Sequence, residues 1–343
     1  MDIIKKYAIY FLAFLIICFF LPALLTTKRK EVSTIAEQEP VKEQEQVQTQ
    51  EKKTYDYNKY AIIKLLHSDT SEIEEVPIDT YLYNVVSAEM PADFELEALK
   101  AQAVVARTYT IYQISHSNGK HGDADICDDS RCCQAWISKE DRFERWEESL
   151  RENNWNKIMQ AVDSTAGKII TYNGEPIDAF FHSNSGGKTE LPVNVWGGAD
   201  FPYLQSVETA GEEGYTQYNS NVTLSKTDLI NKLKEKHPEV EINFDSSDAI
   251  KILEFTDGNR VKTIKFGNIQ ISGVEARATL GLKSANFTVQ IYGENVTFSV
   301  VGYGHGVGLS QTGSDSMAKN GSNYEDIIKH FYTGVEITDV NSL

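Results

Sequence analysis

Apolar residues recur with helical spacing in the stretch that begins at Leu82. Leu82, Val85, Val86 and Glu89 occupy positions i, i+3, i+4 and i+7, which share one face of a helix. Three of the four are apolar and the fourth is a carboxylate. Pro91 predicts that the helix ends just past Glu89. The pattern therefore puts one acidic side chain on the buried face, at the end of the element.

Glu89 is a candidate general acid because apolar side chains surround it in the sequence. Low-polarity surroundings disfavour the ionised carboxylate and raise its pKa. An acid that works near neutral pH requires such a raised pKa. The alternative is an exposed residue of a frayed last turn, or one paired with a lysine.

A second helix is predicted over Leu96 to Ser115, which is rich in alanine and leucine. Lys100 and Arg107 lie on one otherwise apolar face of it, roughly 10 Å apart along the helix axis. One interpretation is that both reach water or pair with nearby acids. The other is that they face the same cleft as Glu89 and bind an anionic or hydroxyl-rich ligand.

A hairpin follows a further predicted helix over Trp155 to Ser164. Lys168 to Tyr172 has strand character, and the dipeptide at 173–174, Asn-Gly, favours a type I′ turn. The second strand leads through His182 and Ser183 into small polar residues and glycines. Such a sequence is typical of a binding loop held on a scaffold, although a plain polar turn fits equally.

The remaining chain predicts one peripheral helix and several strands. The helix is expected over Thr223 to Lys236, and the strands over Ile250 to Thr256, Val261 to Phe266, the stretch from Ser272 to Gly293, and Thr297 to Val301.

The last of these strands runs into GYGHGVGLSQ, in which His305 lies among alternating glycines. Glycines there permit close backbone approach of a ligand, and a helix opening near Ser310 favours an anionic group at its N-terminus. Ser310 and Gln311 lie in the first turn and are candidate binding residues. A tight turn with a buried histidine is the alternative.

Composition limits the function classes. The chain is 41% hydrophobic, enough for a packed core, and its net charge of −17 argues against nucleic-acid binding or the coating of anionic lipid. Its 17 tyrosines, 15 phenylalanines and 4 tryptophans suit stacking on sugars but equally suit an ordinary core.

The N-terminus predicts a membrane anchor and a tether. Tyr7 to Leu25 is uncharged and long enough to span a bilayer, and it lacks the cleavage site of a signal peptide, the competing interpretation. Basic residues on both sides leave its orientation open. Residues 31–54 are dominated by Glu, Gln, Lys and Thr and predict disorder. The expected organisation is anchor 1–30, tether 31–54 and one folded domain 55–343.

Three cysteines and a histidine lie close together in HGDADICDDSRCC. A Cys₃His zinc site would use His121, Cys127, Cys132 and Cys133 with no group left over. A disulfide would leave one free thiol, because the count is odd. A zinc ion with these ligands would be structural, since thiolate-rich sites are closed.

Five motifs together resemble the SpoIID/LytB (amidase-enhancer-like) family. They are SAEMP followed by ALKAQAVVARTY, FFHSNSGGKTE, VWGG with PYLQSV, SGVEARATLGLKS, and GYGHGVGLSQTGS, which occur in this order between Ile78 and Thr338. The resemblance implies a lytic transglycosylase that cleaves the β-1,4 bond between N-acetylmuramic acid and N-acetylglucosamine in peptidoglycan and leaves a 1,6-anhydro end, preferably on peptide-stripped strands.

The family motifs also imply site residues and partners. Glu89, in the AEMP motif, is the expected acid, and no cofactor is needed for catalysis. Residues expected to orient the glycan or line its groove are Lys100, Arg107, Tyr109, His182, Ser183, Tyr203, His305, Ser310 and Gln311. The family setting implies a single-pass protein of the mother-cell membrane, with its domain outside, that acts in engulfment during sporulation beside the amidase SpoIIP and the membrane protein SpoIIM.

Two other function classes stay open. A non-catalytic glycan-binding enhancer of a cell-wall amidase would share the motifs, and a zinc hydrolase would need an open site of histidines and carboxylates, for which no HExxH spacing appears. The expected fold is α+β: one domain, helical in its first third and β-rich after Lys168, with a cleft between the two parts.

Overall fold

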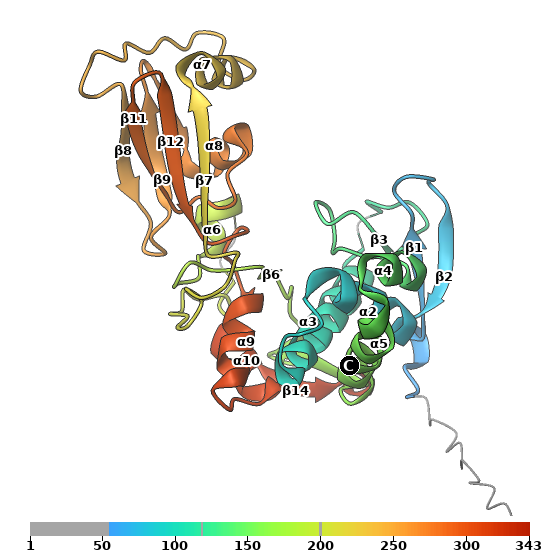
Figure 1. Ribbon diagram of the computed structural model, residues 1–343. Coiled ribbons are helices and arrows are strands. Elements are labelled where there is room, and N and C mark those ends of the chain that lie inside the picture. Colours follow the sequence, from blue (N-terminus) through green and yellow to red (C-terminus); the bar gives the residue numbers. More distant parts are fainter. Residues whose placement is uncertain (1–54, 118, 199–200) are drawn as a thin grey trace, which may run out of the picture. The chain divides into compact units, whose positions relative to one another are not determined.

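Two helices joined by a proline-containing turn begin the helical part of the fold (Figure 1). α2 (Ile78–Glu89) ends where the sequence predicts, because Met90 is extended and Pro91 cannot continue the helix. α3 (Leu96–Ser115) has the predicted bounds. The structure is a computed structural model and describes residues 55–117, 119–198 and 201–343.

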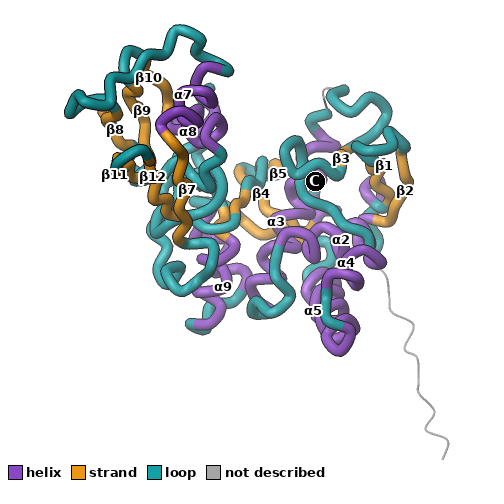
Figure 2. The backbone as a smooth tube through the Cα atoms, turned by 45° about the horizontal axis from the view of Figure 1, so that its top comes forward, coloured by secondary structure: helices purple, strands orange, loops and turns teal. Residues whose placement is uncertain are grey.

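α3 is the central helix of the larger hydrophobic core. Every residue from Ala98 to Ile111 except Lys100 is buried. A helix buried all round must have neighbours on all sides, and α3 contacts α2, α5 (Arg151–Asp163), α9 (Gln311–Lys319), α10 (Tyr324–Phe331) and β4 (Lys168–Tyr172). α2, α3 and α5 lie side by side in Figures 1 and 2.

Small sheets border these helices. β1 (Ile62–Leu66) pairs antiparallel with β2 (Ile73–Pro77) and parallel with β3 (Ile126–Cys127). β4 pairs antiparallel with β14 (Glu336–Asp339) and β5 (Glu175–Pro176).

The predicted hairpin forms only in part. Asn173 and Gly174 both have positive φ, at 52° and 83°, as a type I′ turn requires. The second strand stops at Pro176, however, and His182 belongs to a separate strand, β6 (Phe181–His182). β6 pairs in parallel with β13 (Leu309–Ser310). The motifs around His182 and Ser310 therefore meet as neighbouring strands.

A second hydrophobic core lies between residues 219 and 301. Two antiparallel three-stranded sheets surround it, in the orders β10-β9-β8 and β11-β12-β7, together with α7 and α8 (Figure 1). Its elements are β7 (Asn219–Ser225), α7 (Lys226–Lys234), β8 (Ile250–Phe255), β9 (Val261–Phe266), β10 (Ile269–Ser272), α8 (Gly273–Leu280), β11 (Phe287–Tyr292) and β12 (Asn295–Val301).

Two predictions in this region are wrong. The peripheral helix begins at Lys226 and not at Thr223, because Thr223 lies in β7 and Ser225 caps the helix by accepting a hydrogen bond from the Asp228 N–H. The start of the stretch expected as strand is helix α8, capped in the same way by Ser272. Both errors arise where a short strand passes directly into a helix.

Helices and sheets together make the fold α+β, as predicted. The chain after Lys168 is not uniformly β-rich, since α9 and α10 return to pack on α3. Within residues 55–117, 119–198 and 201–343, no helix has the length and apolar character needed to cross a membrane. The predicted anchor at Tyr7 to Leu25 and the tether at 31–54 lie outside the residues that the structure describes.

Candidate active site

Glu89 lies in the wall of a pocket with a volume of about 580 Å³. The end of α2 and the turn that follows it supply residues 88–94. The segment that contains α4 (Lys139–Arg145) and the start of α5 supplies another wall. Ser183 and Gln311 come from the part of the chain after Lys168. The pocket therefore lies between the early helical segments and the later chain, as the predicted cleft does.

Two hydrogen bonds hold the Glu89 carboxyl group. Its Oε1 accepts one from the backbone N–H of Ala135 at 2.6 Å, and its Oε2 accepts one from the Gln311 side-chain amide at 3.3 Å. Burial nevertheless raises the pKa of Glu89 to about 7, against the opposing effect of these two donors. A carboxyl group with this pKa exchanges its proton readily at neutral pH, which suits an acid that later acts as a base.

A second cavity adjoins the first. It has a volume of about 660 Å³ and shares Pro91, Asp93, Phe94 and Gln217 with the pocket of Glu89. We call the two adjoining cavities together the Glu89 groove. Their combined volume gives room for more than a single small ligand.

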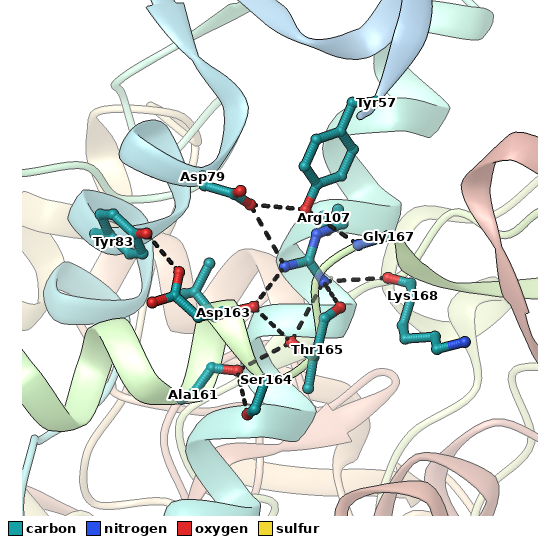
Figure 3. A network of polar contacts seen from close by, with 11 residues as sticks. Tyr57, Asp79, Tyr83, Arg107, Ala161, Asp163, Ser164, Thr165, Gly167 and Lys168 are labelled. Carbon is teal, nitrogen blue, oxygen red and sulfur yellow. Dashed lines mark hydrogen bonds and ion pairs between the residues drawn. The ribbon is translucent and has the colours of Figure 1, made fainter. Parts of the chain in front are cut away.

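The structure does not bring Lys100 and Arg107 to this groove. Lys100 pairs with Glu97 one turn away on α3, at 2.7 Å. The Arg107 side chain is fully buried on the side of α3 that faces α5 and β4 (Figure 3). The expectation that both cations face the cleft with Glu89 is wrong.

Arg107 instead organises the backbone where α5 ends and β4 begins (Figure 3). Its guanidinium donates to the carbonyl oxygens of Val162, Thr165 and Lys168 at 3.1, 2.9 and 3.2 Å. Asp79 lies 4.0 Å away and supplies a countercharge. The Val162 and Thr165 carbonyls also accept backbone N–H groups of the same turns, so the arginine adds a second, charged donor and ties the end of α5 to the start of β4.

Ser310 and the first turn of α9 do bind an anion, but the anion belongs to the protein. The buried carboxylate of Glu212 accepts hydrogen bonds from the hydroxyls of Ser310, Thr312 and Ser185, and from the Gly187 N–H. These donors hold the pKa of Glu212 below its ordinary value despite burial. Glu212 thereby fixes the start of α9, whose first residue is Gln311.

The alternating glycines allow the protein's own backbone to approach. A Cβ on Gly308, where φ is +71°, would lie 2.0 Å from the Phe180 carbonyl oxygen, and one on Gly302 would lie 2.9 Å from that of Asn184. The glycine loop therefore packs against β6 and the residues beside it. This packing alone accounts for the glycines, without the ligand that was expected to approach them.

His182 and His305 lie against each other away from the groove, with ring centroids 5.7 Å apart. His182 is buried and its Nδ1 lies 3.1 Å from the Val307 carbonyl oxygen. Burial lowers the pKa of His182 to about 3, and the pKa of His305 also falls well below its ordinary value. Both imidazoles are therefore neutral at physiological pH.

The two predicted tyrosines are also core residues. Tyr109 is buried on α3, and burial raises its pKa. The Tyr203 hydroxyl accepts a hydrogen bond from the Asp178 N–H at 3.1 Å. Of the predicted glycan-binding residues, only Ser183 and Gln311 line the pocket with Glu89.

The structure brings His121, Cys127, Cys132 and Cys133 together. One ligand atom from each lies within 4.8 Å of the others, and no disulfide joins the cysteines. The His121 Nε2 lies 3.3 Å from the Cys133 Sγ and 4.0 Å from the Cys132 Sγ. Ligands of a tetrahedral zinc ion are separated by about 3.3 to 3.8 Å, as follows from ordinary Zn–N and Zn–S lengths. The His121–Cys133 separation falls within this range and the His121–Cys132 separation exceeds it, so the side chains would have to move slightly to share one ion.

Several groups in the pocket were not predicted. The Ala135 N–H is a backbone donor in an irregular loop, and no side-chain pattern can reveal it. Arg142 lies in α4, and Trp146 follows directly after that helix. Their i, i+4 spacing in a largely polar segment is the sequence feature that could have indicated that the two side chains lie together.

Comparisons with known proteins find sporulation proteins similar to this chain. A family model described as stage II sporulation protein (SpoIID) matches residues 67–172, which include Glu89 and the cysteine cluster. Stage II sporulation protein D of Bacillus subtilis (strain 168) is 36% identical over 82% of this chain and 80% of its own length. The protein of the same name from Bacillus amyloliquefaciens is 34% identical over 82% of this chain and 79% of its own.

A more distant relative is named amidase enhancer, from Bacillus subtilis (strain 168). It is 29% identical over 75% of this chain, which corresponds to 40% of the enhancer. The identity and coverage of the two sporulation proteins are sufficient to assign a family. The chain belongs to the family of stage II sporulation protein D.

Proposed function

We propose that the protein is a lytic transglycosylase of peptidoglycan that cleaves the β-1,4 bond between N-acetylmuramic acid and N-acetylglucosamine. The observation that carries the proposal is the position of Glu89, a carboxyl group with a pKa near 7 in the wall of the Glu89 groove. Family membership agrees with a role in cell-wall remodelling during sporulation.

One carboxyl group suffices for this reaction. Glu89 in its protonated form gives its proton to the glycosidic oxygen as the bond to the muramyl C1 breaks. The C6 hydroxyl of the same muramyl sugar attacks C1, and its proton returns to the Glu89 carboxylate. The products are a free hydroxyl on one sugar and a 1,6-anhydro ring on the other. A hydrolytic glycosidase would normally use a second carboxylate to activate water or to attack C1.

The groove offers the contacts that a glycan needs. Ser183 and Gln311 present polar groups beside Glu89, and Phe94 and Trp146 present aromatic rings. Aromatic rings stack on the apolar faces of sugars while polar groups bind hydroxyls. Product analysis tests the proposal: Glu89→Gln should keep the fold and lose glycan cleavage, and full activity in that variant would contradict the mechanism.

A second candidate function is a glycan-binding enhancer that stimulates a cell-wall amidase without cleaving glycan. The similarity to the relative named amidase enhancer favours it. The two functions differ in one observable, because only a transglycosylase releases anhydro-muramyl products when no other enzyme is present.

We also propose that the His121, Cys127, Cys132 and Cys133 cluster binds a structural zinc ion. The donor set and its spacing support this, and the ion would join an irregular loop to β3, which ends at Cys127. One zinc per chain, lost in His121→Ala and kept in His116→Ala, is the expected result of metal analysis. No zinc in the unsubstituted protein would contradict the proposal.

The cellular role is proposed from family membership. The protein would act at the mother-cell membrane in engulfment, held by its N-terminal anchor, after an amidase such as SpoIIP has removed stem peptides, and together with SpoIIM. Pretreatment of intact cell walls with an amidase should then increase glycan cleavage. Equal cleavage of untreated walls would contradict the proposed order of action.

A further inference from the structure

Arg142 is a cation in the Glu89 pocket that forms no ion pair with residues 55–117, 119–198 or 201–343. It lines the same pocket as Glu89 and is its sole lysine or arginine. Its guanidinium Nε is buried and makes no hydrogen bond to any residue in the part of the chain that the structure describes. Nor does a carboxylate oxygen of those residues lie within the 4.0 Å that defines an ion pair.

Arg142 lies against an aromatic ring. The guanidinium carbon is 4.8 Å from the centre of the Trp146 ring, within the range of a cation–π contact, which itself supplies no counterion. Burial lowers the pKa of Arg142, and Arg145 nearby adds a smaller repulsion. A partly buried charge without a partner is costly, so an anionic ligand at this position is favoured.

The other cation of the groove differs in this respect. Lys319 lines the second cavity but already pairs with Asp315 at 2.7 Å, and it lies over the Tyr215 ring. Its charge is therefore neutralised within the protein. The chain as a whole carries a net charge of −17 and therefore repels an anionic ligand. In the Glu89 pocket, the positive charge of Arg142 can attract such a ligand and offset this repulsion.

The chemistry of the proposed substrate supplies one suitable anion. The muramyl sugar carries a lactyl group on C3. This group ends in a free carboxylate when no stem peptide is attached, and in a neutral amide when one is. An arginine edge binds a carboxylate with two parallel hydrogen bonds, which an amide cannot reproduce.

We propose that Arg142 binds the lactyl carboxylate of a muramyl sugar in the Glu89 pocket and is thereby the residue that distinguishes peptide-free strands from peptide-bearing ones. This inference rests on the proposed function for the identity of the ligand. Arg142 does not take part in proton transfer, so it acts on substrate binding and not on the chemical step.

The test compares two forms of one glycan. Peptide-free strands with free lactyl carboxylates are divided, and one half is converted to neutral lactyl methylamides. Binding of each form is measured on the full chain in detergent micelles, in a Glu89→Gln background in which no cleavage is expected. With Arg142 present, the carboxylate form should bind about tenfold more tightly, the size of one charge-assisted contact.

Two further variants in the same background locate the effect. Arg142→Gln should remove the preference, so that both forms bind with equal affinity. Arg145→Gln is the matched control, since Arg145 is an exposed cation of the same helix that does not line the groove, and it should keep the preference. A preference that persists in Arg142→Gln, or one that disappears equally in Arg145→Gln, would overturn the inference.

The comparison of the two strand forms is made first on the Glu89→Gln protein that keeps Arg142. It needs no substitution at position 142, so misfolding of an Arg142 variant cannot obscure the result. Equal binding of both forms there, or no binding of either, would overturn the inference. The result is independent of catalysis: a preference for the carboxylate form in a protein that never cleaves glycan would refute the proposed function and leave the role of Arg142 standing.

Discussion

The side-chain amide of Gln311 lies 3.3 Å from the Oε2 of Glu89, so the first residue of α9 contacts the last residue of α2. The two residues are far apart in the sequence, and the contact depends on the packing of α9 against α3. Glu212 fixes the start of α9 from the other side. The state of the proposed acid is therefore coupled to the fold of the C-terminal part.

Replacement of Gln311 by alanine should move the pH dependence of cleavage. The Gln311 amide donates to the ionised carboxylate and lowers the pKa of Glu89, so its removal raises that pKa. A general acid must be protonated, and cleavage falls as the pH rises through its pKa. The alkaline limb of the profile should therefore shift upward, by about half a pH unit for one neutral hydrogen bond.

The matched control for Gln311 is Gln217, which lines the same pocket and does not contact Glu89. Gln217→Ala should leave the midpoint of the alkaline limb in place, whatever it does to KM. Equal shifts in both variants, or none in Gln311→Ala, would show that the contact does not tune the acid.

Asp93→Asn should retain glycan cleavage. Asp93 is the other carboxylate in the lining of the Glu89 pocket and is exposed to solvent. Because the sugar hydroxyl is the proposed nucleophile, no second carboxylate is needed, and kcat should change less than about tenfold. A loss as large as that of Glu89→Gln, together with products of the unsubstituted protein that contain an added water, would indicate a hydrolytic glycosidase with two carboxylates.

Glu89→Gln should stabilise the protein at alkaline pH. The pKa of Glu89 rises from 4.5 to about 7 on folding. Between these values the folded state keeps a proton that the unfolded state releases, so the free energy of unfolding falls as the pH rises. At pH 8 the ionised carboxylate should cost about 1 to 3 kcal/mol, which glutamine avoids.

Thermal unfolding of the unsubstituted protein and of Glu89→Gln at pH 5 and pH 8 measures this difference. The variant should gain stability over the parent mainly at pH 8, and the gain should nearly vanish at pH 5. A gain that is equal at the two pH values would mean that the Glu89 pKa is not raised.

Arg107→Lys should destabilise the fold and leave substrate affinity in the surviving protein unchanged. Lysine lacks the planar set of donors that reaches three carbonyl oxygens at once (Figure 3). We expect a loss of about 2 to 4 kcal/mol in the free energy of unfolding, because a buried charge loses hydrogen bonds that its replacement cannot all reproduce. Arg145→Lys, on the exposed side of α4, is the control and should change little.

A normal stability of Arg107→Lys combined with a raised KM would contradict this assignment. It would support the glycan-binding role that the family resemblance implies for Arg107. Chemical denaturation and initial-rate measurements on one preparation distinguish the two cases.

The sequence predicts the position of Glu89 at the buried end of α2 because the evidence for it is local. One carboxylate interrupts an apolar stripe, and Pro91 ends the helix beside it. The bounds of α3 are predicted for the same reason, from an uninterrupted run of helix-forming residues between turn signals.

The surroundings of Glu89 are not predictable in this way. Ala135 contributes a backbone N–H, whose direction depends on the loop conformation. Helical spacing shows that Lys100 and Arg107 share a face, but it cannot show whether that face meets a groove or the carbonyls at the end of α5. Ser310 likewise stands at a predicted helix start, yet the anion it meets, Glu212, lies 98 residues earlier in the chain.

The most direct test of the central claim is the mass of the products from peptide-free glycan strands. The full chain in detergent micelles is incubated with the strands, in parallel with Glu89→Gln. The folded state of each protein is checked by circular dichroism before the products are weighed.

If Glu89 is the acid of a lytic transglycosylase, the unsubstituted protein releases products that end in a 1,6-anhydro sugar, each lighter by one water than the product of hydrolysis. The folded Glu89→Gln variant releases none. Products of the hydrolytic mass, undiminished cleavage by the variant, or the absence of products from the unsubstituted protein would contradict the claim.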